Sequence, residues 1–151
     1  MNLADAFGEE AKREFAQNCI VVGKVIKCFV EDTNPPKEKR FIIVGISNDN
    51  SIKLATVYIN SHVNHNVFPT PELQALHLNL ECANRPYLSY DSHVDCSQLK
   101  KKNKDWLINL IAEDPTRVLG EVAPTDFAII KETLKGTTTI SVADKKRYGL
   151  F

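Results

Sequence analysis

The sequence predicts an α+β fold that is mainly β, an SH3-like small barrel of five to six antiparallel strands with short peripheral helices. Short β-branched runs recur along the chain and are separated by turn-forming residues, which is typical of a sheet built from hairpins. Apolar residues at helical spacing are confined to a few short segments. The chain has 151 residues, of which 43% are hydrophobic and 25% charged, and this favours one compact domain.

The first part of the chain alternates between helical and extended patterns. Residues 3–17 carry apolar side chains at helical spacing among many charges, which predicts an amphipathic surface helix. A strand is expected over residues 19–30, followed by a polar, proline-containing loop over 31–39 that hangs as a flap over the next strand. The runs 41–46 and 52–59 are then predicted to form a hairpin, because their linker SNDNS is rich in turn-forming residues.

The second part adds shorter elements and completes the domain plan. Alternating apolar residues predict strands over 76–80, 92–96 and 116–123. The basic run at 100–104 is expected to lead into a short helix that carries Trp106, and a further helix is expected over 124–134 with Gly136 at its end. We therefore divide the chain into a helical extension (1–18), a barrel domain (19–136) and a C-terminal tail (137–151) whose structure is left open.

The polar ends of the central hairpin are the candidate site. Lys39 and Arg40 precede its first strand, and Asn60 and Ser61 follow its second. An antiparallel hairpin brings these two ends together, so their side chains are predicted to share one small patch. Arg40 suits a phosphate ligand because its planar guanidinium fork matches phosphate geometry and keeps its charge.

Composition and cysteine spacing indicate which partners, metal sites and cell compartment to expect. The formal charge is zero, so no overall basic field indicates nucleic acid, although a local basic patch remains possible. The four cysteines form no CxxC pair, which favours reduced thiols in a cytoplasmic protein over a zinc or redox site. No apolar run is long enough to cross a bilayer, and the N-terminus is too charged for a signal peptide. We expect a cytoplasmic protein with no cofactor, no metal and no membrane contact.

Two segments resemble the MazF/PemK (Kid-like) family of small toxin endoribonucleases, and a third has the right character. The hairpin contributes Lys39-Arg40-Phe41-Ile42-Ile43-Val44 and Ile59-Asn60-Ser61, similar to the family's Arg-led strand and its Ile/Val-Thr-Ser strand end. The segment DSHVDCSQLKKKNKDWL (91–107) is similar to the family's Ser-x-Val-x-Cys-Asp-Gln segment with its following basic stretch and helix. The segment VLGEVAPTDFAIIKETL matches a Gly-centred strand followed by the C-terminal helix, so the resemblance spans residues 19–135.

This resemblance implies a metal-independent endoribonuclease of a toxin-antitoxin system, which cleaves single-stranded RNA through its ribose 2′-OH. It implies a homodimer whose interface groove holds RNA, and a cognate antitoxin that fills the groove. The residues we expect to serve catalysis are Arg40, Ser61, Asn60 and Asp95, and those expected to contact RNA are Lys39, Ser97, Lys100, Lys101 and Lys102. Proton transfer needs a base, for which Asp95, His62, His65 and His93 are all candidates.

Departures from the family pattern support other hypotheses. Phe41 replaces the customary Pro, Asn60 replaces Thr, Asp95 stands where some members have Arg, and Ser97 stands where they have Asp. A non-catalytic SH3-like module that binds nucleic acid or protein is therefore the alternative, and an unrelated phage or mobile-element structural protein is a third. The lysines at 100–104 also suit a solvated face, and Cys96 suits either a nucleophile or the core.

Overall fold

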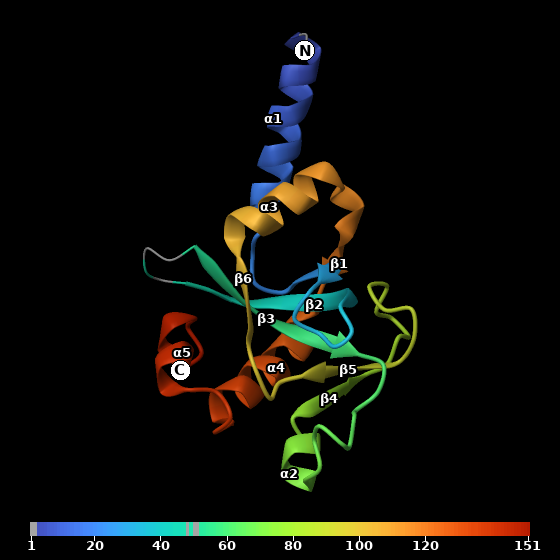
Figure 1. Cartoon of the computed structure of the whole chain (residues 1–151), viewed down its shortest axis with the longest axis vertical. Helices are drawn as coiled ribbons and strands as arrows, with labels where there is room; N and C mark the ends of the chain where they lie inside the picture. The colour runs from blue at the N-terminus through green and yellow to red at the C-terminus, as the bar shows by residue number, and fades with distance from the viewer. Residues whose placement is uncertain (1–2, 48, 50–51) are drawn as a thin grey trace.

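The chain folds around a curled antiparallel sheet that forms a half-barrel with helices packed against it, as the computed structural model shows (Figure 1). The structure describes residues 3–47, 49 and 52–151, which leaves part of the SNDNS linker outside the described residues. In this part of the chain the sheet has 7 strands, in the order β4-β5-β3-β2-β1-β7 with β6 paired to β3. The predicted class, α+β and mainly β with a small barrel-like sheet and short helices, is confirmed.

The strands and helices that the sequence predicts occur in the same order in the structure. The strands are β1 (Lys24–Val30), β2 (Lys37–Ile46), β3 (Lys53–Asn60), β4 (His77–Leu80), β5 (Ser92–Asp95), β6 (Lys100–Asn103) and β7 (Val118–Glu121). The helices are α1 (Leu3–Asn18), α2 (Pro71–Gln74), α3 (Lys104–Glu113), α4 (Pro124–Gly136) and α5 (Val142–Arg147), with a 3-10 turn at Pro115–Arg117.

The sheet buries both of its faces, and each face has its own core. One face packs with α4 and with the C-terminal segment; its core includes Ile42, Val57 and Ile59 of the sheet, Ile130 of α4 and Leu150 of the C-terminal segment. The other face packs with the end of α1 and with α3; its core includes Phe41, Ile43 and Tyr58 of the sheet and Leu107 and Ile111 of α3. Neighbouring residues of a strand point to opposite faces, so β2 and β3 contribute alternately to the two cores.

Three segments differ from the sequence prediction, and a fourth, the tail, whose structure was left open, forms a helix. β2 begins at Lys37, so the last three residues of the predicted loop 31–39 belong to the strand. The first strand begins at Lys24 rather than residue 19, because the chain turns after α1 and passes through Gly23 at φ +94°. The lysines of 100–102, expected to lead into a helix, form β6 along β3. The tail forms α5, whose first turn is capped by the Ser141 hydroxyl, and its residues Tyr148 and Leu150 are buried.

Gly45 fits against this C-terminal segment and tolerates no side chain. A Cβ added to Gly45 would lie 2.6 Å from Cβ of Tyr148 and 2.8 Å from its carbonyl oxygen. Because the Tyr148 backbone cannot swing away as a side chain would, we expect Gly45→Ala to lower the free energy of unfolding by about 1–3 kcal/mol. Urea denaturation measures this, with Gly8→Ala as the control because no atom lies within 4 Å of a Cβ there. Equal midpoints for Gly45→Ala and wild type would contradict the prediction.

No helix in the described part of the chain is both long and apolar enough to cross a membrane.

Candidate nucleic-acid interface

The alternation of β2 and β3 places the predicted patch residues on two faces of the sheet. Arg40 pairs with Ile59 and lies on the α4 face, where Arg40 and Ser61 line a small pocket of about 140 Å³ together with Tyr90 and Ser92. Nη2 of Arg40 donates a hydrogen bond to Oγ of Ser89 at 2.8 Å. The structure thus brings Arg40 and Ser61 together in a pocket that Lys39 also lines, whereas Asn60 lies on the other face of the sheet.

Lys39 and Asn60 meet on the opposite face, which also carries α1 and α3. The ammonium of Lys39 donates a hydrogen bond to Oδ1 of Asn60. The same ammonium lies 5.7 Å from the centroid of the Tyr58 ring, which is two residues before Asn60 in β3 and therefore on the same face. This half of the patch is built from side chains that the period of a strand places side by side.

Strand β6 adds two more lysines to the Tyr58 ring. Lys100 pairs with Thr56 and Lys102 with Leu54, so both point to the Tyr58 face. Their ammonium groups lie 5.5 and 5.1 Å from the ring centroid. We call Lys39, Lys100 and Lys102 the lysine cluster. Lys101 points to the other face, where it forms an ion pair with Asp144 at 3.0 Å.

Asp32 is the carboxylate that contacts the lysine cluster directly. Nζ of Lys102 lies 3.0 Å from Oδ2 of Asp32, and the Tyr58 hydroxyl donates a hydrogen bond to Oδ1. Burial opposes ionisation of Asp32, but the hydrogen bonds from Tyr58 and Lys102 outweigh it and hold the pKa below its ordinary value. Burial and the neighbouring Asp32 raise the pKa of Tyr58, so its hydroxyl stays protonated. Asp32 therefore contacts one ammonium group of the cluster, that of Lys102, and the charge of Lys100 acts on it from further away.

Lys39 has a pKa below that of an ordinary lysine. Partial burial and then the nearby Lys37 lower its pKa to about 8; Lys100 acts in the same direction and Asp95 in the opposite one. A lysine with this pKa is mostly protonated at neutral pH, yet it gives up its proton far more readily than an exposed lysine. The hydrogen bond that the Lys39 ammonium donates to Oδ1 of Asn60 fixes the position of the ammonium group.

Asp95 and Ser97 form a closed arrangement of their own. Asp95 is only 4% exposed, and its carboxylate accepts hydrogen bonds from the backbone N–H of Ser97 at 2.9 Å, the Ser97 hydroxyl at 2.5 Å and Nε2 of Gln98 at 3.2 Å. It lies 3.4 Å from Nε2 of His77. The carboxylate is thus saturated by the turn after β5, and it acts on the lysine cluster through its charge rather than through contact.

The structure distinguishes among the histidines that the sequence left open. His93 pairs with Asn60 across β3 and β5, so its ring lies on the face of Lys39. Its Nδ1 is buried and has no hydrogen-bond partner in the described part of the chain. Burial, and then the charges of His77 and His62, lower the pKa of His93 below its ordinary value, so the ring is neutral at neutral pH. His62 and His65 lie exposed in the loop after β3.

Sequence reasoning missed Tyr58 and Asp32. The period of two along β3 contains the signal for Tyr58, because it places Tyr58 and Asn60 on one face. Asp32 lies in a loop whose position no pattern in the chain determines. Burial and Asp95 raise the pKa of Cys96 to about 12, which leaves a thiol in the core rather than a nucleophile. Among the described residues, no group of three or more His, Cys, Asp or Glu could hold a metal ion.

Comparison with protein-family models finds no match to this chain, and no curated protein is significantly similar to it. The MazF/PemK resemblance therefore stays a prediction.

Proposed function

We propose that the chain is an endoribonuclease of the MazF/PemK kind that binds single-stranded RNA on the lysine cluster. The observation that supports this most directly is the gathering of three ammonium groups within 5.7 Å of one tyrosine ring, of which only that of Lys102 forms an ion pair, with Asp32, among the described residues. The whole chain has a formal charge of zero, so this local excess is a feature of one face. RNA phosphates supply the missing negative charge, and each phosphate bound releases counterions from the strand.

The same face holds groups for acid-base chemistry. Neutral His93 accepts the proton of the ribose 2′-OH, and the 2′-oxygen attacks the adjacent phosphorus. The bond from phosphorus to the 5′-oxygen breaks, and the ammonium of Lys39 gives its proton to that leaving oxygen. Lys100 stabilises the charge on the phosphorane oxygens. The products are a 2′,3′-cyclic phosphate and a 5′-hydroxyl, with the transferred proton balanced between His93 and Lys39.

Asn60 holds Lys39 in place for this step. It accepts the hydrogen bond from the ammonium and stands directly opposite His93 in the β3–β5 pair. An amide in this position orients both groups without taking part in proton transfer. The side chain of Arg40 points to the other face and donates its hydrogen bond to Ser89, although Arg40 and Lys39 both line the small pocket there, so Arg40 is a suitable control.

The cognate antitoxin, the homodimer and the cytoplasmic setting belong to the same proposal. The family resemblance alone supports the antitoxin and the homodimer, and the cysteine spacing supports the cytoplasmic setting. An acidic antitoxin segment has the right charge to compete with RNA for the lysine cluster.

The proposal is tested by incubating the protein with a long single-stranded RNA in EDTA. We expect fragments with 2′,3′-cyclic phosphate ends, and we expect Lys39→Gln to reduce them far more than Arg40→Gln. Each substitution removes one cation from neighbouring positions on opposite faces, so the pair is matched. Equal loss in both variants would contradict the assignment of the reacting face, and absence of both binding and cleavage in wild type would overturn the function.

A non-catalytic RNA-binding module is the second candidate. The observation that favours it is the Asp95 carboxylate, which is occupied by the turn that follows β5 and cannot reach a substrate. RNA binding without fragments in the same assay would support this candidate.

Salt dependence measures the binding half of the proposal separately. Because Lys102 is buried and paired with Asp32, a single-stranded RNA is expected to contact Lys39 and Lys100, with a slope of log Kd against log salt of roughly 1.4, from about 0.7 per phosphate contact. Replacing Lys100 by Gln should lower this slope by about one contact, whereas Lys101→Gln should leave it unchanged because Lys101 faces Asp144. Fluorescence anisotropy of a labelled oligonucleotide measures both, and identical slopes for the two variants would contradict the lysine cluster as the binding face.

A further inference from the structure

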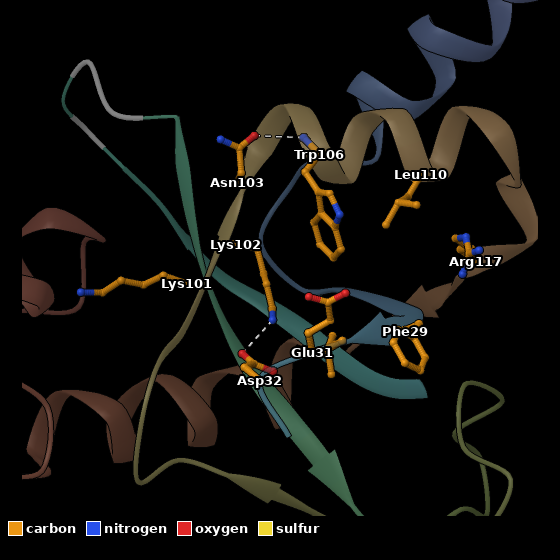
Figure 2. Close-up of a pocket in the computed structure, with 10 residues that line it drawn as sticks. Phe29, Glu31, Asp32, Lys101, Lys102, Asn103, Trp106, Leu110 and Arg117 are labelled. Atoms are coloured by element: carbon orange, nitrogen blue, oxygen red, sulfur yellow. Dashed lines mark hydrogen bonds and ion pairs between the residues drawn. The ribbon is translucent and has the colours of Figure 1, made fainter. Parts of the chain in front are cut away.

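A cleft of about 520 Å³ adjoins the lysine cluster (Figure 2). It lies between α3, which supplies Trp106 and Leu110, and the end of β1 with the loop that follows, which supplies Glu31 and Asp32. Lys102 lines it as well and so belongs to both the cleft and the lysine cluster. A volume of this size is within the range of small-molecule and nucleotide pockets.

The apolar wall of the cleft is an aromatic ring without an aromatic partner. Oδ1 of Asn103 accepts a hydrogen bond from the backbone N–H of Trp106 at 3.0 Å, which fixes the first turn of α3. The indole extends from α3 toward Glu31, with Leu110 one turn further along the helix (Figure 2). Trp106 is 37% exposed, and within the described residues its ring contacts no other aromatic ring. Its open side can therefore accept a planar group.

The polar groups of the cleft are divided by charge. Lys102 is paired with Asp32 at 3.0 Å, so that pair is nearly neutral. Arg117 lines the cleft with a buried Nε that has no hydrogen-bond partner among the residues the structure describes, where its Nη1 makes a long contact of 3.4 Å to the Lys27 carbonyl. Glu31 makes no ion pair within the described chain and faces the indole (Figure 2). A ligand that fits must offer N–H donors to Glu31 and acceptors to Arg117.

We infer that this cleft receives one nucleobase of the RNA strand whose phosphates lie on the lysine cluster, an inference that rests on the proposed function. The base stacks on the indole of Trp106, its N–H groups donate to Glu31, and its carbonyl or ring nitrogen accepts from Arg117. The backbone leaves the cleft past Lys102 and reaches Lys100 and Lys39. Stacking on a tryptophan accepts every base, so the cleft anchors the strand more than it reads its sequence.

Trp106 is the single tryptophan of the chain, so it reports directly on occupancy of the cleft. The probe is a short RNA with 2′-O-methyl groups, which removes the nucleophile and separates binding from cleavage. Its titration is expected to change the indole fluorescence to saturation. Trp106→Leu should weaken binding by about 5- to 100-fold, the effect of losing one stacked base, whereas Trp106→Phe keeps a ring and should lose less. Phe151→Ala, at an exposed aromatic outside the cleft, should leave binding unchanged.

Failure of this inference is distinguishable from failure of the proposed function. Suppose that wild type binds the RNA and that Lys39→Gln weakens this binding. If the indole fluorescence of wild type then does not change on binding, and Trp106→Leu binds the RNA with wild-type affinity, the cleft is empty and the inference is overturned. If wild type does not bind the RNA at all, the proposed function falls and the cleft assignment falls with it. Circular dichroism of Trp106→Leu and Trp106→Phe shows whether a loss of binding reflects unfolding, and Trp106→Phe keeps the test valid if Trp106→Leu unfolds.

Discussion

Replacing Lys39 by glutamine is expected to lower the rate of RNA cleavage by about 10²- to 10⁴-fold, the usual contribution of a general acid. The wild-type rate should be bell-shaped in pH. It falls at low pH as His93 becomes protonated, below the ordinary pKa of histidine, and it falls at high pH as Lys39 loses its proton around its pKa of about 8. The variant has no ammonium at this position, so it should lose the alkaline limb and keep the acidic one.

Single-turnover rates at saturating protein measure this profile without interference from weaker binding. Lys53→Gln is the matched control, because Lys53 is an exposed lysine at the opposite end of β3 from Asn60. A Lys39→Gln profile that keeps the alkaline limb would show that another group donates the proton.

Replacing Phe41 by alanine is expected to lower the free energy of unfolding by about 3–5 kcal/mol, the typical cost of truncating a buried phenylalanine. Phe41 is fully buried, and its ring centroid lies 6.3 Å from that of Tyr58, whose ring carries the lysine cluster. Loss of Phe41 thus removes packing beneath the candidate site as well as core volume. Phe41→Leu keeps most of the volume and should cost less than about 1.5 kcal/mol.

Urea denaturation followed by Trp106 fluorescence measures both Phe41 variants. A loss for Phe41→Ala no larger than that for Phe41→Leu would mean that the neighbouring side chains close over the cavity. In that case the support for the Tyr58 ring does not depend on this phenylalanine.

The fold could be predicted from the sequence because its signals are local. The β-branched runs, the turn-forming linkers and the helical spacing of 124–134 each determine their element without help from distant residues. Strand β6 was missed because three lysines and an asparagine carry no strand pattern. These residues become extended only by hydrogen bonding along β3, which is a tertiary effect.

The candidate site was predictable in its residues but not in its division between two faces. Lys39, Asn60, Lys100 and Lys102 do gather, and Arg40 and Ser61 do share a pocket. The run Phe41–Val44 is apolar throughout and buried on both faces, so it gives no alternation from which the face of Lys39 or Arg40 could be deduced. Asp32 and the Trp106 cleft depend on contacts between segments far apart in the chain.

The close fit of Gly45 against Tyr148 helps to determine whether Lys39 or Arg40 lies on the face of the lysine cluster. A strand that is apolar on both sides can slide by one residue without exposing its core, and such a slide would exchange Lys39 and Arg40 between the two faces. The bulge between Ile43 and Gly45 and the missing Cβ at Gly45 favour one alignment, because any other residue would bring a side chain against Tyr148. Gly45 is remote from the lysine cluster, but it thus helps to fix the register of β2. The register in turn determines the face of the sheet on which Lys39 lies.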